Sequence, residues 1–530
     1  MPSLNKTTVR NMNIWQISRE YAGIAEAGGV KNVCTSLAEG LVDIGANVTH
    51  FIPFYGCTNL NAVKEFKTIS NISWSFTFNN KKHSVNFARA YSGTVTIIFV
   101  INSLFTQKNG VYTYTALDEA LKPEHKQGEG HKDASLLNMI FQTSILNYSI
   151  QTGQYPDIIH CQDAATALIP FLAHKKNKYK QITKKASFII TIHNAGRGYH
   201  HTFSLIDGIN FTGLAENNFT HAILNGRVEP LLLSTQYALY TTVSPWYAKE
   251  LVNPKNKNSG GLSAEFAKRK VSIKGITNGI DYEKYNPSDI NKSLLPFPYN
   301  PEKGDFSGKR LALQKFINYY KSPHNSTVYL PTNPDQICQY GTINHTKNCV
   351  YFSFHGRLVE QKGIDVLVGA AKITLEKTSN IRFLIIGQGS TDLEKKCIQL
   401  AKQFAGRFLY LKGYDRSIAR QCVAVADFLL LPSYFEPCCL EDFIGQLFGT
   451  IPIAHAAGGL QKIIHGKTGY VYKKNTADNL ATIILKLSTK KIRNPKKFLK
   501  LAKKGALHTR KKYSWHRVIK DNYIPLYLNV

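Results

Sequence analysis

The stretch VYFSFHGRLVEQKG, from Val350 to Gly363, decides the fold. Its beginning, up to Phe354, has the apolar, β-branched and aromatic composition of a buried strand. A turn with two cations, Arg357 and Lys362, comes next, and Gly363 opens a helical pattern. The stretch therefore predicts a strand, a positively charged turn and a helix.

A second stretch, LLLPSYFEPCCLEDF from Leu429 to Phe443, repeats this scheme. Asp427 to Leu431 is a short apolar segment that predicts a strand, and a proline and a serine end it. Glu436 follows, just before a helical pattern that begins at Leu440. In an open α/β sheet both turns lie at the carboxyl ends of parallel strands, where ligands bind. One turn offers two cations and the other a carboxylate.

These groups suit the transfer of a sugar away from a diphosphate. Fixed cations and helix N-terminal amides stabilise the charge that the departing diphosphate gains in the transition state. A carboxylate accepts hydrogen bonds from sugar hydroxyls and orients the ring. The alternative is purely structural: Arg357 and Lys362 form a solvated pair at the helix start, and Glu436 caps a helix. Spacing alone leaves both interpretations open.

The first half of the chain shows the same type of pattern. The first predicted strand is followed by the tight turn Gly28-Gly29, which either lets the backbone approach a phosphate or serves only packing. His160 comes after one predicted strand, and His193 and Asn194 come after the next. These positions fall where a doubly wound sheet has its ligand crevice. A histidine at such a strand end is either satisfied by local hydrogen bonds or catalytic.

Composition indicates a globular, multidomain chain. With 530 residues and 43% hydrophobic content, the chain can form two or three domains, each with its own core. No secretory signal and no apolar run of membrane-spanning length is present, so we expect a soluble, cytoplasmic protein without a membrane span. The nine cysteines lack CxxC spacing, and the adjacent His200 and His201 lack an acidic partner. We therefore expect reduced thiols and no metal site.

The net charge of +31 raises the question of a nucleic-acid partner. The lysines are spread along the chain, and no known nucleic-acid-binding module is present. We therefore expect no nucleic acid among the partners. A compositional bias toward lysine explains the charge, and attraction to nucleotide diphosphates or a membrane surface is the alternative.

Several strings occur in the order and spacing of one known family. They are GRLVEQKGID, ADFLLLPSYFEPC, GTIPIAHAAGGL and KTGYVY in the second half, and ISREYAGIAEAGGV, TIHNAG, TTVSPWYAKEL and ITNGIDYEKYNP before them. The chain resembles the bacterial glycogen and starch synthases, retaining glycosyltransferases of the GT-B fold, over nearly its whole length. The resemblance implies an α/β protein with two Rossmann-like, doubly wound domains that face each other across a deep cleft.

The resemblance also implies the domain boundaries. Residues 1–275 form the glucan-side domain, and residues 276–505 form the nucleotide-sugar domain. The proline-rich segment at about 287–348 is expected to be an irregular insertion. Residues 506–530 form a C-terminal helix that returns to the first domain.

Site residues carry over position by position. The resemblance implies catalytic roles for Arg357, Lys362, Glu436 and His160, with the two cations on the diphosphate and the glutamate on the glucose. Tyr414 matches a tyrosine near the nucleobase. The full set of positions implied to bind substrate is Gly28, Gly29, His193, Asn194, Asn278, Tyr414, Cys438, Cys439, Leu440, Gly458 and Gly459.

The chain departs from the family pattern mainly in its first half. Glu26 stands where the family has a lysine that faces the donor phosphates, and a carboxylate about 5 Å from a diphosphate costs roughly 3 kcal/mol at an effective dielectric of about 20. Lys31 is placed to compensate. Gln162 replaces the second histidine of the HxHDW motif, and Ala164 replaces its tryptophan. Cys439 replaces a glycine, so a positive φ there would be strained.

Two functions remain at this point. The first is a synthase that transfers glucose from ADP-glucose or UDP-glucose to the non-reducing end of an α-1,4-glucan, with retention of configuration. It needs a nucleotide-sugar donor and a glucan acceptor, and neither a metal nor another cofactor. The alternative is a catalytically weakened glucan- or nucleotide-binding regulatory homologue, or a retaining glycosyltransferase with another acceptor. Glu26 and Gln162 favour the weakened homologue, whereas the intact donor half favours the synthase.

Overall fold

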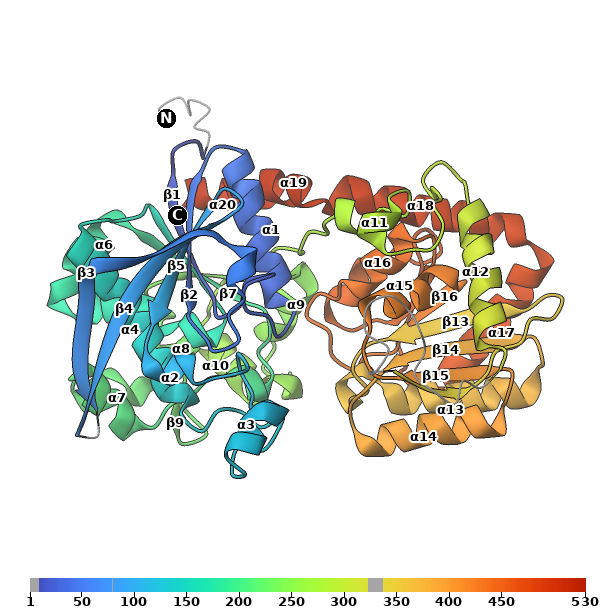
Figure 1. Ribbon diagram of the computed structural model, residues 1–530, viewed down its shortest axis with the longest axis horizontal. Helices are drawn as coiled ribbons and strands as arrows, with labels where there is room; N and C mark the ends of the chain where they lie inside the picture. The colour runs from blue at the N-terminus through green and yellow to red at the C-terminus, as the bar shows by residue number, and fades with distance from the viewer. Residues whose placement is uncertain (1–8, 79, 323–336) are drawn as a thin grey trace. The chain divides into compact units, whose positions relative to one another are not determined.

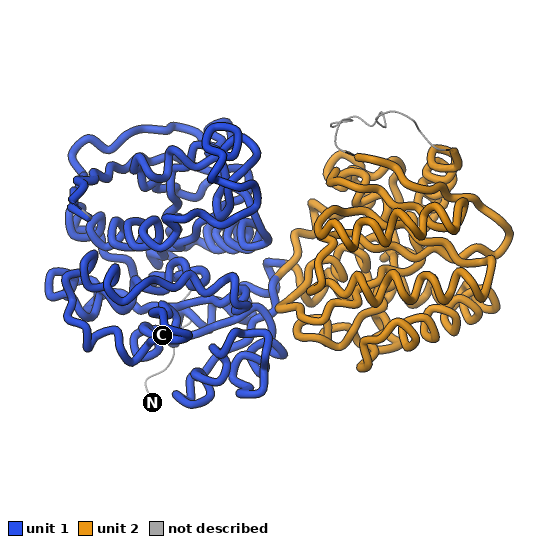
Figure 2. Tube along the Cα trace, turned by 90° about the horizontal axis from the view of Figure 1, so that it is seen from below, with its two compact units in different colours: residues 1–278, 515–530 blue, residues 279–514 orange. Residues whose placement is uncertain are grey.

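The computed structural model describes residues 9–78, 80–322 and 337–530. They group into two compact units, one made of the chain up to Asn278 together with Trp515–Val530, the other of Gly279–Ser514 (Figure 2). Each unit contains one large, mostly parallel sheet with helices around it (Figure 1). The boundaries proposed from the sequence, after residues 275 and 505, lie three and nine residues before those of the compact units.

The large sheet of unit 1 has nine strands in the order β11-β10-β7-β6-β1-β2-β5-β4-β3. The strands from β11 to β5 pair in parallel, whereas β4 pairs antiparallel with both β5 and β3. Since β1 lies between β2 and β6, the strand order reverses there, and ligands of such sheets bind at the carboxyl ends of the strands beside this point. The strands are β1 (Asn13–Ile17), β2 (Asn47–Pro53), β3 (Lys64–Phe78), β4 (Lys81–Ser92), β5 (Val95–Ile101), β6 (Ile158–Gln162), β7 (Ser187–Ile192), β10 (Leu239–Thr242) and β11 (Ile273–Gly275), with a separate hairpin of β8 (Ile223–Leu224) and β9 (Arg227–Val228).

The sheet of unit 2 has seven strands in the order β12-β15-β14-β13-β16-β17-β18. All neighbours pair in parallel except β12, which is antiparallel to β15. The order reverses between β13 and β16, so the turns after these two strands meet at the expected ligand edge. The strands are β12 (Cys338–Gly341), β13 (Val350–His355), β14 (Ile381–Gly387), β15 (Phe408–Lys412), β16 (Phe428–Leu431), β17 (Ile451–His455) and β18 (Tyr470–Tyr472).

Helices connect successive strands in both units (Figure 1). Those of unit 1 are α1 (Val30–Asp43), α2 (Ser103–Thr106), α3 (Ala116–Leu121), α4 (Ala134–Thr152), α5 (Leu168–Lys175), α6 (Lys180–Lys185), α7 (Leu205–Thr212), α8 (Pro230–Leu233), α9 (Pro245–Leu251), α10 (Leu262–Lys268), α19 (Trp515–Val518) and α20 (Ile524–Leu528). Those of unit 2 are α11 (Ile290–Ser293), α12 (Ser307–Tyr320), α13 (Ile364–Lys377), α14 (Thr391–Gln403), α15 (Arg416–Val425), α16 (Glu441–Leu447), α17 (Ala477–Arg493) and α18 (Pro495–Tyr513).

Strand β13 shows why its sequence reads as a buried strand. Val350, Phe352 and Phe354 are buried in one apolar cluster, whereas Tyr351, which points the opposite way, is buried in another. Both faces of the strand are therefore covered, which is why the run is almost continuously apolar and does not alternate with polar residues.

The segment at about 287–348 is more regular than expected, and the prediction of an irregular insertion is wrong for much of it. It contains the 14-residue helix α12 and the strand β12, while residues 323–336 lie outside the described part of the chain. Ala312, Phe316 and Tyr320 recur every four residues and are buried against the sheet of unit 2. This helical period is hidden in the sequence by the prolines on either side.

The C-terminal segment Trp515–Val530 packs within unit 1. Ile519, Tyr523 and Tyr527 are buried there. A Cβ added at Gly40 in α1 would collide with the Ile519 side chain, so the small residue makes room for this segment. Its last turns thus complete the core of unit 1.

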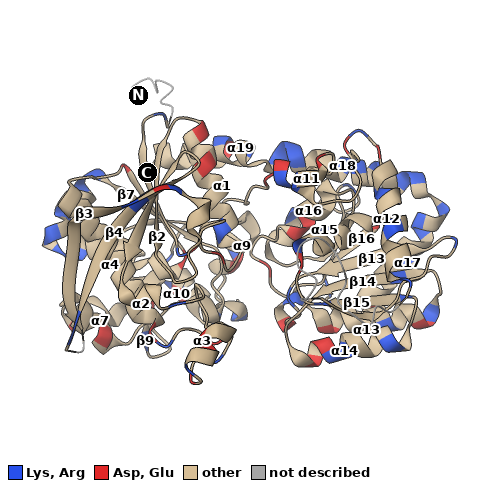
Figure 3. Cartoon of the chain, viewed as in Figure 1, with Lys and Arg blue, Asp and Glu red and all other residues tan. Residues whose placement is uncertain are grey.

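Lysine and arginine side chains are distributed over helices of both units (Figure 3). All nine cysteines are free thiols. Within the described ranges, no helix is long and apolar enough to cross a membrane, and no group of three metal-binding side chains comes together.

Candidate active site

The turns after β13 and β16 come together in unit 2. Lys362 Nζ lies 2.6 Å from Glu436 Oε2, and their side chains are only 21% and 10% exposed. Ser433 also donates to this carboxylate oxygen, at 3.3 Å. Gly363 permits the approach, because a Cβ at this position would overlap the carbonyl group of Pro432. Lys362 is therefore not part of a solvated pair, and Glu436 does not cap a helix.

The charge of Lys362 depends on this contact. Burial by itself lowers the pKa of the lysine, but the Glu436 carboxylate more than offsets this effect, so the pKa is raised. The ammonium group is thus protonated at neutral pH and has further N–H groups beyond the one directed at Glu436.

Arg357 differs from Lys362 in its surroundings. It is exposed, and its guanidinium group has no hydrogen-bond or ion-pair partner within the described ranges. An unpaired cation at the carboxyl end of β13 is available to an anionic ligand.

His355 and Glu441 form a second pair at this edge, which the sequence analysis missed. His355 Nε2, at the end of β13, lies 2.8 Å from Glu441 Oε2, at the first position of α16. Burial alone raises the pKa of Glu441, but the nearby His355 and Lys362 lower it by more. The pKa of Glu441 is therefore below its usual value. The signal that could have revealed this pair is that each residue flanks one of the two turns.

Other predicted positions of unit 2 lie in the loop between β16 and α16 and in the turn after β17. Cys439 has a φ of 63°, so it occupies the left-handed region in which a side chain is disfavoured. Cys438 and Cys439 are buried, and Leu440 directly precedes α16. The Gly459 amide donates to the Glu436 carbonyl oxygen, and the turn Gly458–Lys462 follows β17.

Two further predicted positions differ in their exposure. Tyr414, two residues after β15, is 60% exposed. Asn278 is buried, and its side-chain oxygen has no partner within the described part of the chain. Their assigned roles remain predictions.

In unit 1, the glycine turn after β1 is already engaged. Glu20 Oε2 accepts hydrogen bonds from the amides of Ala27 and Gly28, at 3.0 Å and 2.5 Å. The Gly28 amide is therefore occupied by the chain's own carboxylate and is not open to a phosphate in this conformation. Gly29 ends the turn as the residue before α1.

Glu26 is also paired within its own loop. Its two carboxylate oxygens accept from the Gly23 amide at 2.7 Å and from Lys31 Nζ at 2.6 Å. Lys31 thus compensates the charge of Glu26, as the sequence allowed.

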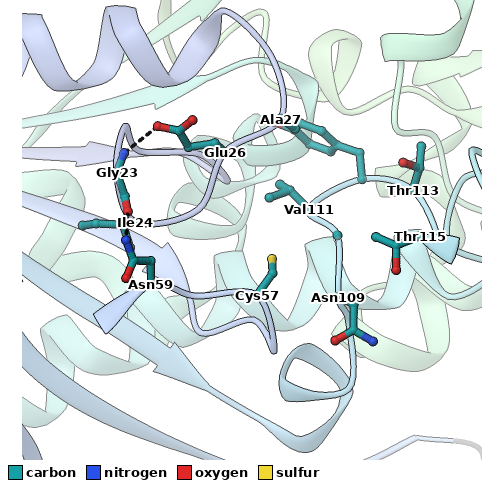
Figure 4. A pocket seen from close by; sticks show the side chains of 12 residues that line it. Gly23, Ile24, Glu26, Ala27, Cys57, Asn59, Asn109, Val111, Thr113 and Thr115 are labelled. Carbon is teal, nitrogen blue, oxygen red and sulfur yellow. Dashed lines mark hydrogen bonds between the residues drawn. The ribbon is translucent and has the colours of Figure 1, made fainter. Parts of the chain in front are cut away.

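A hollow of about 480 Å³ lies beside this loop (Figure 4). Glu26, hydrogen-bonded to Gly23, stands at its edge, and side chains with amide and hydroxyl groups line much of the rest. No lysine, arginine or histidine is among the described lining residues, so the hollow suits a hydroxylated ligand better than a phosphate. The lining residues are Gly23, Ile24, Glu26, Ala27, Cys57, Asn59, Asn109, Gly110, Val111, Tyr112, Thr113 and Thr115.

His160 does not lie at a strand end, and in this respect the sequence analysis was wrong. β6 continues to Gln162, so His160 is inside the strand and fully buried. Its Nδ1 lies 2.9 Å from the Tyr527 hydroxyl and its Nε2 lies 2.6 Å from the Thr191 hydroxyl. Burial lowers the pKa of His160 to about 3. Both ring nitrogens are thus engaged by side chains of the core, and the catalytic role of His160 stays a prediction.

The end of β6 is instead formed by Gln162 and Asp163. Gln162 Oε1 lies 2.7 Å from His193 Nε2, while its side-chain nitrogen is buried without a partner among the described residues. Asp163 accepts from the amides of His193 and Asn194, at 2.6 Å and 3.3 Å. Burial lowers the pKa of His193 to about 4, so the ring is neutral at pH 7. These contacts bring the residues at the ends of β6 and β7 together.

Comparison with known proteins agrees with this architecture. The family described as starch synthase catalytic domain matches residues 13–267, and the family described as glycosyl transferases group 1 matches residues 335–505. In solved structures, the catalytic domain of starch synthase IV from Arabidopsis thaliana, bound to ADP and acarbose, superposes with a TM-score of 0.79 at 22% identity, covering 98% of this chain and 99% of that chain. Sucrose-phosphate synthase from Thermosynechococcus elongatus superposes with a TM-score of 0.56 at 16% identity, over 98% of this chain and all of that one. The chain is thus a glycosyltransferase of the GT-B fold.

Relatives found by sequence are named as one kind of glycosyltransferase, glycogen synthase. A glycogen synthase of Thermodesulfovibrio yellowstonii is 27% identical over 97% of this chain and 97% of its own length. A glycogen synthase of Flavobacterium johnsoniae is 28% identical over 86% of this chain and 85% of its own length. Residues 13–267 thus match the starch synthase catalytic domain family, and the chain is similar to glycogen synthases over most of its length.

Proposed function

We propose that the protein transfers glucose from ADP-glucose or UDP-glucose to the non-reducing end of an α-1,4-glucan, with retention of configuration. One observation carries this proposal: the Lys362 ammonium and the Glu436 carboxylate meet within 2.6 Å at the ligand edge of the unit 2 sheet. A cation for a phosphate and a carboxylate for a sugar are thereby adjacent, as a nucleotide sugar requires.

The donor side follows from the charges. When the bond between C1 of glucose and the diphosphate breaks, negative charge grows on the departing phosphate oxygen. Lys362, which is protonated, and the exposed Arg357 stabilise this charge more in the transition state than in the ground state. Glu436 accepts hydrogen bonds from glucose hydroxyls and holds the ring in register with the two cations. The glucan hydroxyl oxygen then bonds to C1 on the same face that the diphosphate leaves, and the hydroxyl proton passes to the departing phosphate oxygen.

The acceptor side draws on unit 1. Its hollow beside the glycine turn offers neutral amide and hydroxyl groups and one carboxylate that is already paired. Such a lining matches the hydroxyl groups of a glucan. His193 and Gln162 add a neutral imidazole and an amide at the end of the neighbouring strands.

A weakened, regulatory homologue is the second candidate. It is favoured by Glu20, which occupies the amides of Ala27 and Gly28, and by Gln162 in place of a histidine. Against it, Glu26 is paired with Lys31, so the repulsion of a donor phosphate is weaker than an unpaired carboxylate would cause. We therefore favour the active synthase.

The test is a direct assay. Purified protein is incubated with ADP-glucose or UDP-glucose, with and without glycogen, and release of the nucleoside diphosphate is measured. We expect release that depends on glycogen and persists in EDTA, because the proposed reaction needs no metal. Absence of release with both donors would reject the synthase, and glycogen binding without release would support the regulatory homologue.

A further inference from the structure

A buried lysine supports the loop that carries Glu436. The loop joins β16 to α16, and the carbonyl groups of Cys438 and Cys439 in its middle receive hydrogen bonds from a side chain. That side chain is Lys462, whose Nζ donates to the Cys438 oxygen at 2.6 Å and to the Cys439 oxygen at 2.9 Å. The third partner of this ammonium group is Asp442 Oδ1, at 2.8 Å. The ammonium group thus makes two hydrogen bonds to backbone carbonyls and one ion-pair contact.

The ion pair is fully removed from water. The side chains of Lys462 and Asp442 are 1% and 0% exposed, and the ammonium nitrogen lies 4.4 Å from the centre of the Phe443 ring. Burial opposes the charge of Lys462, but Asp442 outweighs it and the pKa of the lysine is raised. Because a buried charge is costly unless it is paired, losing one of these partners would destabilise the arrangement.

The same turn also holds Glu436 itself. Gly459, which lies with Lys462 in the turn Gly458–Lys462, donates its amide to the Glu436 carbonyl oxygen at 2.8 Å. The turn after β17 therefore binds the backbone of residues 436, 438 and 439, while the Glu436 side chain points to Lys362.

The conformation of Cys439 explains why such support is needed. Its φ of 63° is one that a residue with a side chain rarely adopts. Glycine would reach this conformation without strain, whereas cysteine needs compensating interactions. The charge-assisted hydrogen bond from Lys462 to the Cys439 carbonyl oxygen forms only while the Cys439 peptide group keeps its orientation.

We propose that Lys462, anchored by Asp442, is a positioning residue: it holds the peptide groups of Cys438 and Cys439 and thereby sets where the Glu436 carboxylate stands relative to Lys362. This inference deepens the proposed function and rests on it for its catalytic consequence. Lys462 itself touches only protein groups among the described residues, so it acts through Glu436.

The test combines Lys462→Met with Cys439→Gly. In Lys462→Met, the glucose transfer rate constant kcat should fall about 100-fold, as expected when a group held in catalytic register is displaced. The affinity for the free nucleoside diphosphate, which lacks the sugar, should change less than about threefold. Adding Cys439→Gly should restore at least about tenfold of the lost rate, because glycine adopts the required φ without help. Lys467→Met, at an exposed lysine of the same segment, is the matched control and should behave as the parent.

Hydrogen–deuterium exchange of the peptide covering residues 433–441 measures the positioning without reference to activity. Exchange there should be faster in Lys462→Met and slower again in the double variant. If Lys462→Met does not fold, Asp442→Asn, which keeps the shape and removes the anchoring charge, should show the same changes to a smaller extent. Unchanged exchange and unchanged kcat, or a double variant no better than the single one, would overturn the inference. An inactive parent protein whose exchange responds as expected would reject the proposed function and leave the positioning role supported.

Discussion

Replacing Lys362 by methionine tests whether its pair with Glu436 is a buried interaction or a solvated one. The two charges touch at 2.6 Å, and the partner left behind, Glu436, has a side chain that is only 10% exposed. Removing one member of a buried ion pair costs about 3–5 kcal/mol, and since Lys362 retains 21% exposure we take the lower end, about 3 kcal/mol. For a domain of this size, each kcal/mol lowers the melting temperature by about 2–4 °C, so the transition of unit 2 should fall by about 6–12 °C.

A second substitution separates the lost contact from the stranded charge. In Lys362→Met with Glu436→Gln, the unpaired carboxylate is gone, so about half of the lost stability should return, whereas glucose transfer should stay absent in both variants. Scanning calorimetry and the transfer assay measure the two effects on the same samples. Lys372→Met, at an exposed position of α13, is the matched control. A single variant as stable as the parent, or a double variant no more stable than the single one, would refute the reasoning.

Three further predictions follow from individual contacts. Arg357→Ala should leave stability unchanged, since the guanidinium group has no partner within the described ranges. The same change should weaken nucleotide-sugar binding about tenfold, as measured by calorimetry. Unchanged binding would show that Arg357 is not part of the site. Glu26→Lys with Gln162→His should slow transfer, because it places a cation beside Lys31 and removes the acceptor of the Gly23 amide, and a faster double variant would indicate a decayed synthase. Unit 1 should lose stability between pH 7.5 and pH 5.5, because four buried histidines and one partly buried histidine have pKa values lowered by desolvation to about 3 or 4. They stay neutral in the folded state and bind a proton below about pH 6.5 only in the unfolded state, which costs up to about 1.4 kcal/mol per group and pH unit. A urea midpoint for unit 1 that does not change over this range would contradict the prediction. These histidines are His50, His131, His160, His193 and His201.

The strands and the turns that bear the donor-side groups could be predicted because their signals are local. The run from Val350 to Phe354 is apolar throughout since both faces of β13 are covered, and the glycine at 363 marks a close approach to the next turn. The helix α12 escaped prediction because its period lies between prolines and reads as irregular. In both cases, success depends on how clearly a short stretch of sequence shows the spacing of its apolar residues.

The position of His160 inside a strand could not be predicted in the same way. Its motif suggested a strand end, but two more residues of β6 pair with β7, which moves the histidine into the core. Its partner Tyr527 lies 367 residues later in the chain, in the segment that returns to unit 1. No pattern in a short window reports a contact of that separation.

The sequence by itself determined the class of fold, the order of strands and helices around the cationic turn and the acidic turn, and the resemblance to a family. These follow from periodicity, turn chemistry and motifs that are local in the chain. Only the tertiary structure decided how the charges are paired: Lys362 with Glu436, His355 with Glu441, Lys462 with Asp442, and Glu20 with the amides of the glycine turn. The reason is physical. The free energy of a buried charge depends on which groups surround it and at what distance, and those neighbours come from turns that are brought together only when the parallel strands align at one edge of a sheet.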